Sequence, residues 1–206
     1  HFADGAAAAH LIQRQQAAQR RAMMARAEGR PRLDQHGDLA RRMAGYGMRE
    51  QVPDFTTFSL IEVPREQRHL ALQLYLQEIE ADDPDVHTVV VLDVITDCVG
   101  NFNDPRDSMG LTDFLNQQIS QRNVSFMCVI HENPGGGDKA RGHVGTELMN
   151  KASTILQIAF QKDGSGRDTD LLVINNLKNR SGAKLPPVYA QYDAQRKALV
   201  AADDES

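Results

Sequence analysis

Two short apolar runs dominate the hydrophobic pattern of the chain, and each ends abruptly in polar residues. Residues 89–92 are followed by Asp93, and residues 127–130 are followed by His131. A run that is apolar at every position, and not only at alternate ones, predicts a strand covered on both faces, as in the centre of a parallel sheet. We therefore expect these runs to be adjacent or nearly adjacent parallel strands that are almost fully buried.

The polar residues after these runs are the first candidates for chemistry. In an open parallel sheet, ligands bind beyond the carboxyl ends of the strands. Five polar side chains fall on that edge if the strands are parallel: Asp93, Asp97, His131, Glu132 and Asn133.

Helices and strands alternate through the first part of the pattern. Helices are expected over residues 5–28, 38–48, 64–81, 108–122 and 146–151, with Ser108 as the N-cap of the fourth. A strand-like segment covers residues 55–63. The helix opened by Pro64 places leucines at the spacings of a buried face.

The last part of the pattern predicts a run of strands. These cover residues 154–160, 170–177 and 188–192, and Gly164 to Gly166 suggests an antiparallel hairpin between the first two. Together with the alternation before them, they predict an α/β layered fold with a mostly parallel sheet and an antiparallel extension. The 206 residues suffice for a single domain, and residues 201–206 read as a flexible tail.

Composition narrows the class of protein. The formal net charge is −5, so the chain is not a globally basic nucleic-acid binder, although a local basic patch remains compatible with it. No apolar run approaches the roughly 20 residues of a membrane span, and no secretory signal pattern is present. Cys98 and Cys128 lie in or beside apolar runs, which favours buried reduced thiols and a cytoplasmic location.

Asp93 and His131 carry the most specific chemistry of the sheet edge. A carboxylate at a strand end can orient a water molecule bound to Mg²⁺, since hard cations prefer oxygen ligands. Asp97 adds to the acidic edge. A histidine at the end of the next strand can donate a hydrogen bond to a terminal phosphate. The plainer readings are an aspartate that caps a loop and a histidine that is satisfied at a strand end.

Two basic groups follow along the chain. Lys139, Arg141 and His143 come after the loop Gly135 to Gly137, where they could meet an anionic ligand or a nucleic-acid backbone, or simply belong to a surface turn. Lys178 and Arg180 are two residues apart, so on an extended chain they point the same way and could clamp a phosphate. The alternative for this pair is an exposed basic hairpin end.

The order of these features resembles that of the RecA-like hexameric ATPases. It comprises an Asp-ended strand, a His-ended strand, Arg141-Gly-His-Val-Gly-Thr-Glu-Leu148 and Lys178-Asn-Arg-Ser-Gly182. The likeness is closest to the plasmid replicative helicase type and related ATPases of mobile elements and phages, and it covers about residues 55–192.

That resemblance implies a fold, ligands and roles. It implies a RecA-like three-layer domain over residues 1–200, ATP and Mg²⁺ as ligands, a homo-oligomeric ring and single-stranded DNA as a partner. Asp93 then stands on the Mg²⁺ side of a Walker B strand, and His131 is the sensor. Lys178 and Arg180 are the Lys-x-Arg pair that reaches a neighbouring subunit's nucleotide as an arginine finger. The loop from Pro134 to Arg141 faces the central channel and DNA.

The sequence departs from that family in one serious way. No Gly-x-x-x-x-Gly-Lys-Ser/Thr phosphate-binding loop occurs in the 206 residues. Two explanations stay open: a piece of a longer ATPase, or a relative that keeps the fold and has lost hydrolysis. Two other classes also stay open: a non-catalytic assembly or adaptor subunit, and a metal-dependent phosphoesterase or nuclease built on Asp93, Asp97, His131 and His143.

Overall fold

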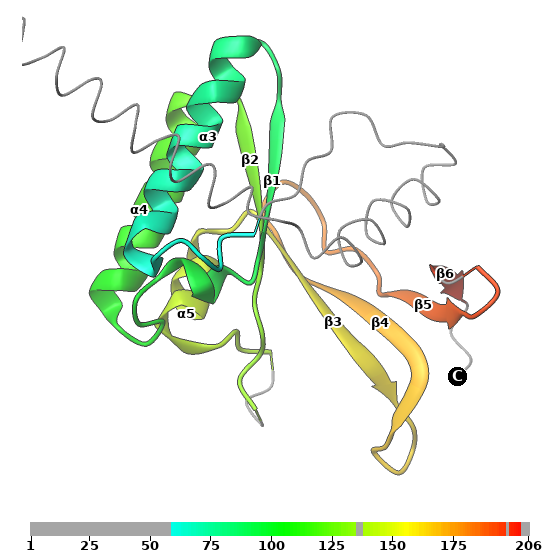
Figure 1. The fold of residues 1–206 in the computed structure, drawn as a ribbon. Coiled ribbons are helices and arrows are strands. Elements are labelled where there is room, and N and C mark those ends of the chain that lie inside the picture. The colour runs from blue at the N-terminus through cyan, green and yellow to red at the C-terminus, as the bar shows by residue number, and fades with distance from the viewer. Residues whose placement is uncertain (1–58, 135–137, 197, 203–206) are drawn as a thin grey trace, which may run out of the picture.

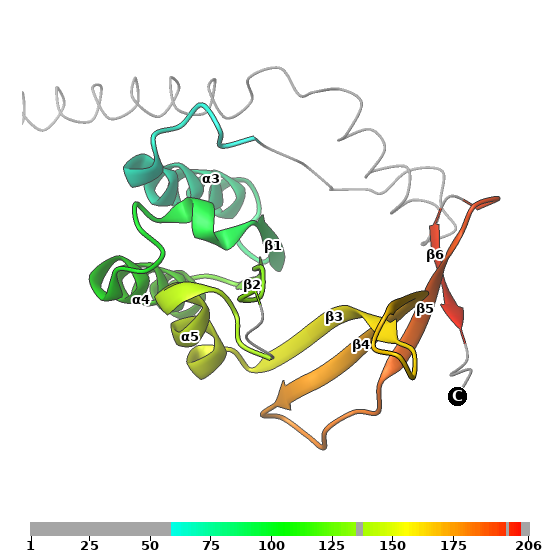
Figure 2. The same cartoon turned by 90° about the horizontal axis from the view of Figure 1, so that it is seen from below.

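The computed structural model describes residues 59–134, 138–196 and 198–202. The helices expected over residues 5–28 and 38–48, most of the strand expected over 55–63, and the loop Gly135 to Gly137 lie outside the described residues. Within them the protein is mixed α/β, with a two-stranded parallel sheet and a separate four-stranded antiparallel sheet. Figures 1 and 2 show the three helices gathered around the parallel pair, while the antiparallel strands extend away from it.

The first part of the described chain builds the helical body. Its elements are η1 (Arg65–Gln67), α3 (Arg68–Asp82), β1 (Thr88–Asp93), η2 (Ile95–Cys98), α4 (Pro105–Gln121), β2 (Val124–Val129) and α5 (Gly142–Lys151). The second part builds the antiparallel sheet from β3 (Thr154–Lys162), β4 (Asp168–Asn179), β5 (Val188–Asp193) and β6 (Ala198–Ala202).

The parallel pairing of the two apolar runs is confirmed. β1 and β2 are hydrogen-bonded neighbours in parallel, with Thr88 opposite Val124 and Asp93 opposite Val129. The carboxyl ends of both strands therefore meet at one edge, as the sequence predicts for Asp93 and the residues after Val129. The peptide bond from Asp93 to Val94 is cis.

The expectation that these strands are almost fully buried is wrong. Their exposure alternates, and Val89 and Met127 are 60% and 58% exposed on the open face. The opposite face packs on the core that Leu92 forms with Ile95, Leu111 and other buried residues. Among the described residues, helices cover one face of the pair and no third strand joins it. The mixed α/β class is thus established, whereas three layers around a central sheet are not.

The start of α4 also differs from the prediction. Asp104, and not Ser108, is the N-cap: its carboxylate accepts hydrogen bonds from the backbone N–H groups of Arg106 and Asp107. Pro105 occupies the first helical turn, where a missing N–H costs nothing. Ser108 is fully buried and its hydroxyl donates to the carbonyl of Asp104. A carboxylate followed by proline was the stronger start signal.

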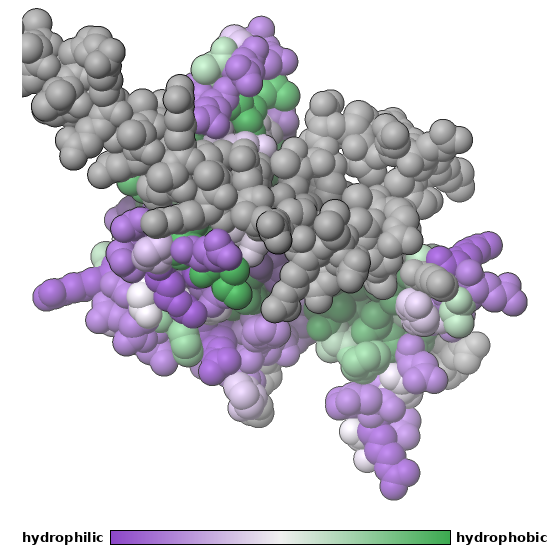
Figure 3. Space-filling view, in the orientation of Figure 1, coloured by the Kyte–Doolittle hydropathy of each residue, from purple (hydrophilic) through white to green (hydrophobic). Residues whose placement is uncertain are grey.

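The hairpin between β3 and β4 is confirmed as antiparallel, with Ile158 opposite Ile174. Asp163 closes its turn by accepting hydrogen bonds from the backbone of Ser165 and Arg167, and Gly166 takes the positive φ of +81° that the turn requires. Figure 3 shows an apolar area over part of the antiparallel sheet. The exposed apolar side chains of β3 include Leu156, Ile158 and Phe160.

Three further boundaries correct the prediction. Residues 59–63 form no strand; they are a turn leading into η1. The helix expected over 146–151 begins at Gly142. Residues 201 and 202, assigned to the flexible tail, end β6, which pairs with β5.

Both cysteines are free thiols, as expected. Burial raises the pKa of Cys98, and it raises the pKa of Cys128 to about 11, with a smaller contribution from nearby Cys98. None of the helices in the described part of the chain has the length and apolar character that crossing a membrane requires.

Candidate functional site

The carboxyl edge of the parallel pair holds Asp93 and His131. Asp93 is the last residue of β1 and is exposed, and its carboxylate forms no hydrogen bond or ion pair with a described residue. His131 follows the end of β2 by two residues and is also exposed. Because Asp93 lies opposite Val129 in the ladder, the two candidate side chains belong to the same edge.

Asp97, the other acidic candidate, is engaged elsewhere. It lies in η2, and its Oδ1 accepts a hydrogen bond of 3.0 Å from the guanidinium of Arg65 in an ion pair. The backbone carbonyl of Asp97 accepts a further bond of 2.6 Å from Arg68. The acidic edge predicted from the sequence therefore holds two different carboxylates: Asp93, which has no partner among the described residues, and Asp97, which pairs with Arg65.

The chain beyond His131 folds back on itself. Glu132 and Ala140 form an antiparallel bridge, and the N–H of Arg141 donates to the carbonyl of His131 at 2.9 Å. The N–H of Asn133 donates to the carbonyl of Lys139 at 3.0 Å. This hairpin brings Arg141 back to the end of β2, whereas Lys139 remains on its exposed outer part.

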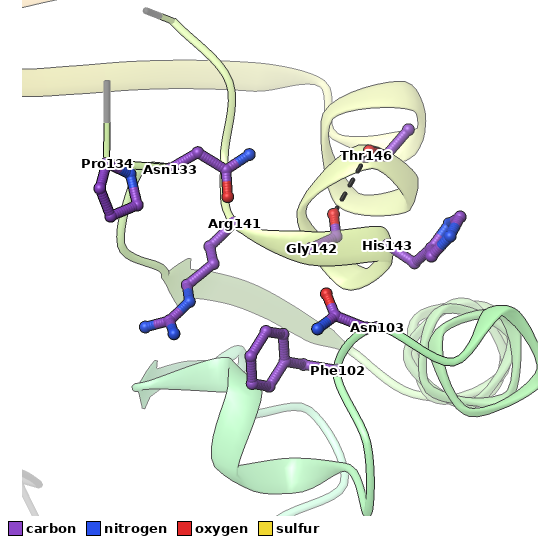
Figure 4. Close-up of a pocket in the computed structure, with 8 residues that line it drawn as sticks. All are labelled: Phe102, Asn103, Asn133, Pro134, Arg141, Gly142, His143 and Thr146. Carbon is purple, nitrogen blue, oxygen red and sulfur yellow. Dashed lines mark hydrogen bonds between the residues drawn. The ribbon is translucent and has the colours of Figure 1, made fainter. Parts of the chain in front are cut away.

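A cleft of about 520 Å³ opens between this hairpin, the loop after η2 and the start of α5. Eight residues line it: Phe102, Asn103, Asn133, Pro134, Arg141, Gly142, His143 and Thr146. The guanidinium of Arg141 lies 4.9 Å from the centre of the Phe102 ring, a cation–π contact that fixes its place. Figure 4 shows the amides of Asn103 and Asn133 facing the space before α5, while His143 points away from Arg141.

The start of α5 is fitted tightly against the loop that carries Phe102. Gly142 has φ +72°, and a Cβ there would lie 2.7 Å from the Phe102 ring and 2.9 Å from Oδ1 of Asn103. The N–H of Val144 donates to the carbonyl of Phe102 at 3.2 Å. No side chain from the described part of the chain caps this helix, so its partial positive charge faces the cleft, which suits an anion.

Lys178 and Arg180 meet at the opposite end of α5. Lys178 Nζ donates to the carbonyl of Met149 at 2.6 Å and to that of Asn150 at 3.1 Å. Arg180 Nη2 donates to the carbonyl of Asn150 at 2.5 Å. The pKa of Lys178 is lowered by loss of solvent and, to a smaller extent, by the charge of Arg180. The pair thus points the same way, as predicted, and both cations bind the negative end of their own helix.

A polar contact links the hairpin to the antiparallel sheet. Gln157 Nε2 donates to Glu132 Oε1 at 2.6 Å and to Asp138 Oδ1 at 3.1 Å. Its Oε1 accepts a bond of 3.3 Å from Asn175, its cross-strand neighbour. The hairpin is therefore tied to β3 and β4 as well as to α5.

The predicted residues do not converge on a single point. Asp93 and His131 share the sheet edge, Arg141 and His143 line the cleft, and Lys178 with Arg180 lie at the far end of α5. Within residues 59–134, 138–196 and 198–202, no three His, Cys, Asp or Glu side chains form a group that could hold a metal ion.

Several site residues could not be recognised from the sequence. Phe102 lines the cleft without any motif to mark it, whereas Thr146 lies within the Arg141-to-Leu148 motif but had no role assigned to it. Arg65 and Arg68 likewise gave no signal, because their target, η2, lies about 30 residues away in the chain.

Comparison with models of known protein families finds no match for this chain. No curated protein matches it either.

Proposed function

We propose that the protein is an ATP-dependent, DNA-associated motor of the RecA-like helicase type, of the kind found in plasmids, phages and mobile elements. The observation that carries this proposal is the placement of Asp93. Its carboxylate is exposed and unpaired among the described residues, at the carboxyl end of a parallel strand whose neighbour leads directly to His131. That edge is where an α/β sheet binds its ligand.

Asp93 suits the Mg²⁺ that accompanies ATP. Mg²⁺ in nucleotide sites is held by one or two carboxylates, water molecules and the phosphates themselves, so a single free carboxylate is an adequate protein contribution. When bound, the ion neutralises part of the negative charge of the phosphates. In this proposal Asp93 orients a water ligand of the ion, and His131 donates a hydrogen bond toward the terminal phosphate.

Lys178 and Arg180 supply the contact between subunits of a proposed homo-oligomeric ring. Negative charge in phosphoryl transfer is spread over the equatorial phosphate oxygens, and an arginine from a neighbour can be worth about 10³ to 10⁵ in rate. Arg180 is exposed, so it is accessible to a second subunit. To reach the phosphate of a neighbouring subunit, the guanidinium of Arg180 must break its hydrogen bond with the Asn150 carbonyl. The nucleotide therefore competes with the end of α5 for Arg180.

The cleft and its hairpin supply the proposed contact with single-stranded DNA. Arg141 and the uncapped start of α5 favour a phosphate group there, with Lys139 and His143 on either side of Arg141 in the chain. Phosphate contacts of this kind are independent of base sequence, as a motor that moves along DNA requires.

A non-catalytic adaptor with the same architecture is the second candidate. The engagement of Lys178 and Arg180 with their own α5 favours it, because the pair then acts as a helix cap and needs no nucleotide. The phosphoesterase alternative is weaker, since Asp97, one of its four candidate ligands, is paired with Arg65.

ATP turnover by the full-length protein, with and without the Asp93→Asn substitution, tests the proposal. Asp93→Asn should abolish turnover and leave the thermal unfolding temperature almost unchanged, because the carboxylate has no described partner. Asp113→Asn, at an exposed position on α4, is the matched control and should keep wild-type turnover. Near-normal turnover by the Asp93→Asn protein would refute the Walker B role, and no turnover by the wild type would favour the adaptor.

A further inference from the structure

Two arginines, Arg65 in η1 and Arg68 at the start of α3, bind the turn that follows Asp93. Arg65 donates to the carbonyls of Thr96 and Val99 at 3.4 and 3.3 Å and to the Asp97 carboxylate at 3.0 Å. Arg68 donates to the carbonyl of Asp97 at 2.6 Å. The two guanidinium groups therefore bind three backbone carbonyls in η2 and directly after it, those of Thr96, Asp97 and Val99.

Arg68 is unusual in how its charge is satisfied. It is only 8% exposed, and it pairs with no carboxylate among the described residues. Besides Asp97, its partners are the carbonyls of Val63 at 3.0 Å and Ile61 at 3.5 Å. Burying a cation is costly unless its donors are met, so this site is built around the guanidinium. Arg68 thereby ties the entry into α3 to the turn after β1.

The gripped turn lies between two functional features. Asp93 stands at one end of this stretch of chain, and Phe102 and Asn103, which line the cleft, stand at the other. Between them the buried Ile95 and Cys98 fix η2 from the inside, while the arginines fix it from the outside. A displacement of η2 would therefore move both Asp93, the residue proposed to face Mg²⁺, and the part of the cleft wall formed by Phe102 and Asn103.

We infer that Arg65, Arg68 and Asp97 form a positioning clamp that sets the direction of the Asp93 carboxylate. Asp97 is then the anchor of Arg65 and not a ligand of Mg²⁺. The observed hydrogen bonds support the clamp as a structural unit. Its role in catalysis rests on the proposed ATPase function. Small displacements of a reacting group can cost about a hundredfold in rate, so a clamp remote from phosphate can still matter.

The structural half of the inference is tested by amide hydrogen exchange on the complete chain. Arg65→Met and Arg68→Met should speed exchange of residues 94–99 by about tenfold or more, while residues in the middle of α4 keep their protection. Arg122→Met is the matched control. Arg122, at the end of α4, pairs at 3.2 Å with Glu80, which lies near the other end of α3 from Arg68. Unchanged exchange over residues 94–99 in the Arg65→Met protein, which loses only a half-exposed side chain, would overturn the clamp.

The catalytic half is tested by the Mg²⁺ dependence of ATP turnover in the full-length protein. Arg65→Met and Asp97→Asn should each lower kcat by a similar factor, about tenfold, at an unchanged half-saturating Mg²⁺ concentration, and Arg65→Lys should restore part of it. If Asp97→Asn raises the Mg²⁺ requirement and Arg65→Met does not, Asp97 is a ligand and the inference is wrong. A wild type without turnover refutes the ATPase proposal and the clamp's role in catalysis, and the exchange data still decide the structural clamp.

Discussion

Arg180 and Asn150 are joined by a 2.5 Å hydrogen bond from the guanidinium to the backbone carbonyl, which places a predicted phosphate-binding cation on the last turn of its own α5. Lys178 binds the carbonyl of the preceding residue, Met149. Cations at a helix C-terminus satisfy carbonyls that lack intrahelical partners and oppose the negative end of the dipole. The same two residues thus have a visible structural role and a proposed role in a neighbouring subunit.

The structural role predicts a local effect of removing Lys178. Lys178→Met should increase amide exchange in the last turn of α5 and at Ala152, because the Met149 carbonyl loses its donor and the Asn150 carbonyl keeps only Arg180. Lys184→Met removes the same charge from the exposed segment before β5 and should leave that exchange unchanged. Equal exchange in both variants would show that the contacts with α5 do not hold the helix end.

Gly142 should not tolerate a side chain. Its φ of +72° costs an L-residue about 1–2 kcal/mol, and the new Cβ would lie 2.7 Å from Phe102. Gly142→Ala should therefore lower the free energy of unfolding by at least that amount and disturb the cleft, as measured by urea denaturation.

Gly110 provides the contrasting substitution. It lies within α4, and an added Cβ meets no atom within 4 Å. Gly110→Ala should stabilise the protein by about 0.4–1 kcal/mol, because alanine loses less backbone entropy in a helix. If Gly142→Ala did not lower the free energy of unfolding, the described geometry of the α5 start would be wrong, whatever the effect of Gly110→Ala.

His69 should make stability depend on pH. Its ring stacks on Phe114 with centroids 5.0 Å apart, and its Nε2 is buried without a hydrogen-bond partner among the residues that the structure describes. Burial lowers its pKa below the usual 6.5, against smaller opposing effects of the Cys98 backbone and Asp107. The unfolded chain therefore binds the proton more readily, so the contribution of His69 is complete above pH 6.5 and is lost as the pH falls from that value through the lower pKa of the folded protein.

Urea denaturation at pH 7.5 and pH 5.5 measures this effect. The wild type should lose more stability on acidification than His69→Gln, which cannot take up the proton. A loss of equal size in both proteins would assign the pH dependence to other groups.

The strand pairing was predictable from the sequence because the two apolar runs are strongly patterned over short distances. The exposure of Val89 and Met127 was not, since a continuous apolar run looks the same whether one face or two are covered. The N-cap expected at Ser108 was wrong because Asp104 followed by Pro105 is the stronger start signal, while Ser108 lies one turn later and its hydroxyl donates to the carbonyl of Asp104.

The candidate site was predictable only for polar residues whose place in the fold follows from the strand pattern. Asp93 and His131 follow strands, so their shared edge follows from parallel pairing. The contact of Arg141 with Phe102 and that of Arg68 with Asp97 join residues about 30 to 40 positions apart, and no local pattern encodes them. The engagement of Lys178 and Arg180 with α5 depends on how the antiparallel sheet packs, which is a tertiary property.

The cleft should contribute to binding of single-stranded DNA. Arg141→Met should weaken binding of an oligothymidylate by the full-length protein and reduce the slope of log K against log salt by roughly one phosphate contact, about 0.7. Arg167→Met, at the β3–β4 turn, removes an equal charge outside the cleft. Fluorescence anisotropy across a salt series measures both, and equal slopes would remove Arg141 from the DNA contact.

Subunit mixing tests the central claim most directly, because it asks whether Asp93 and Arg180 of different subunits build one ATP site. In the full-length protein, Asp93→Asn and Arg180→Ala should each abolish most turnover. Mixed one to one, they should regain activity at up to about a quarter of the interfaces, where an intact Asp93 meets a neighbour's intact Arg180. Turnover of the mixture that never exceeds that of the separate variants would contradict a shared nucleotide site and leave Lys178 and Arg180 as the cap of α5.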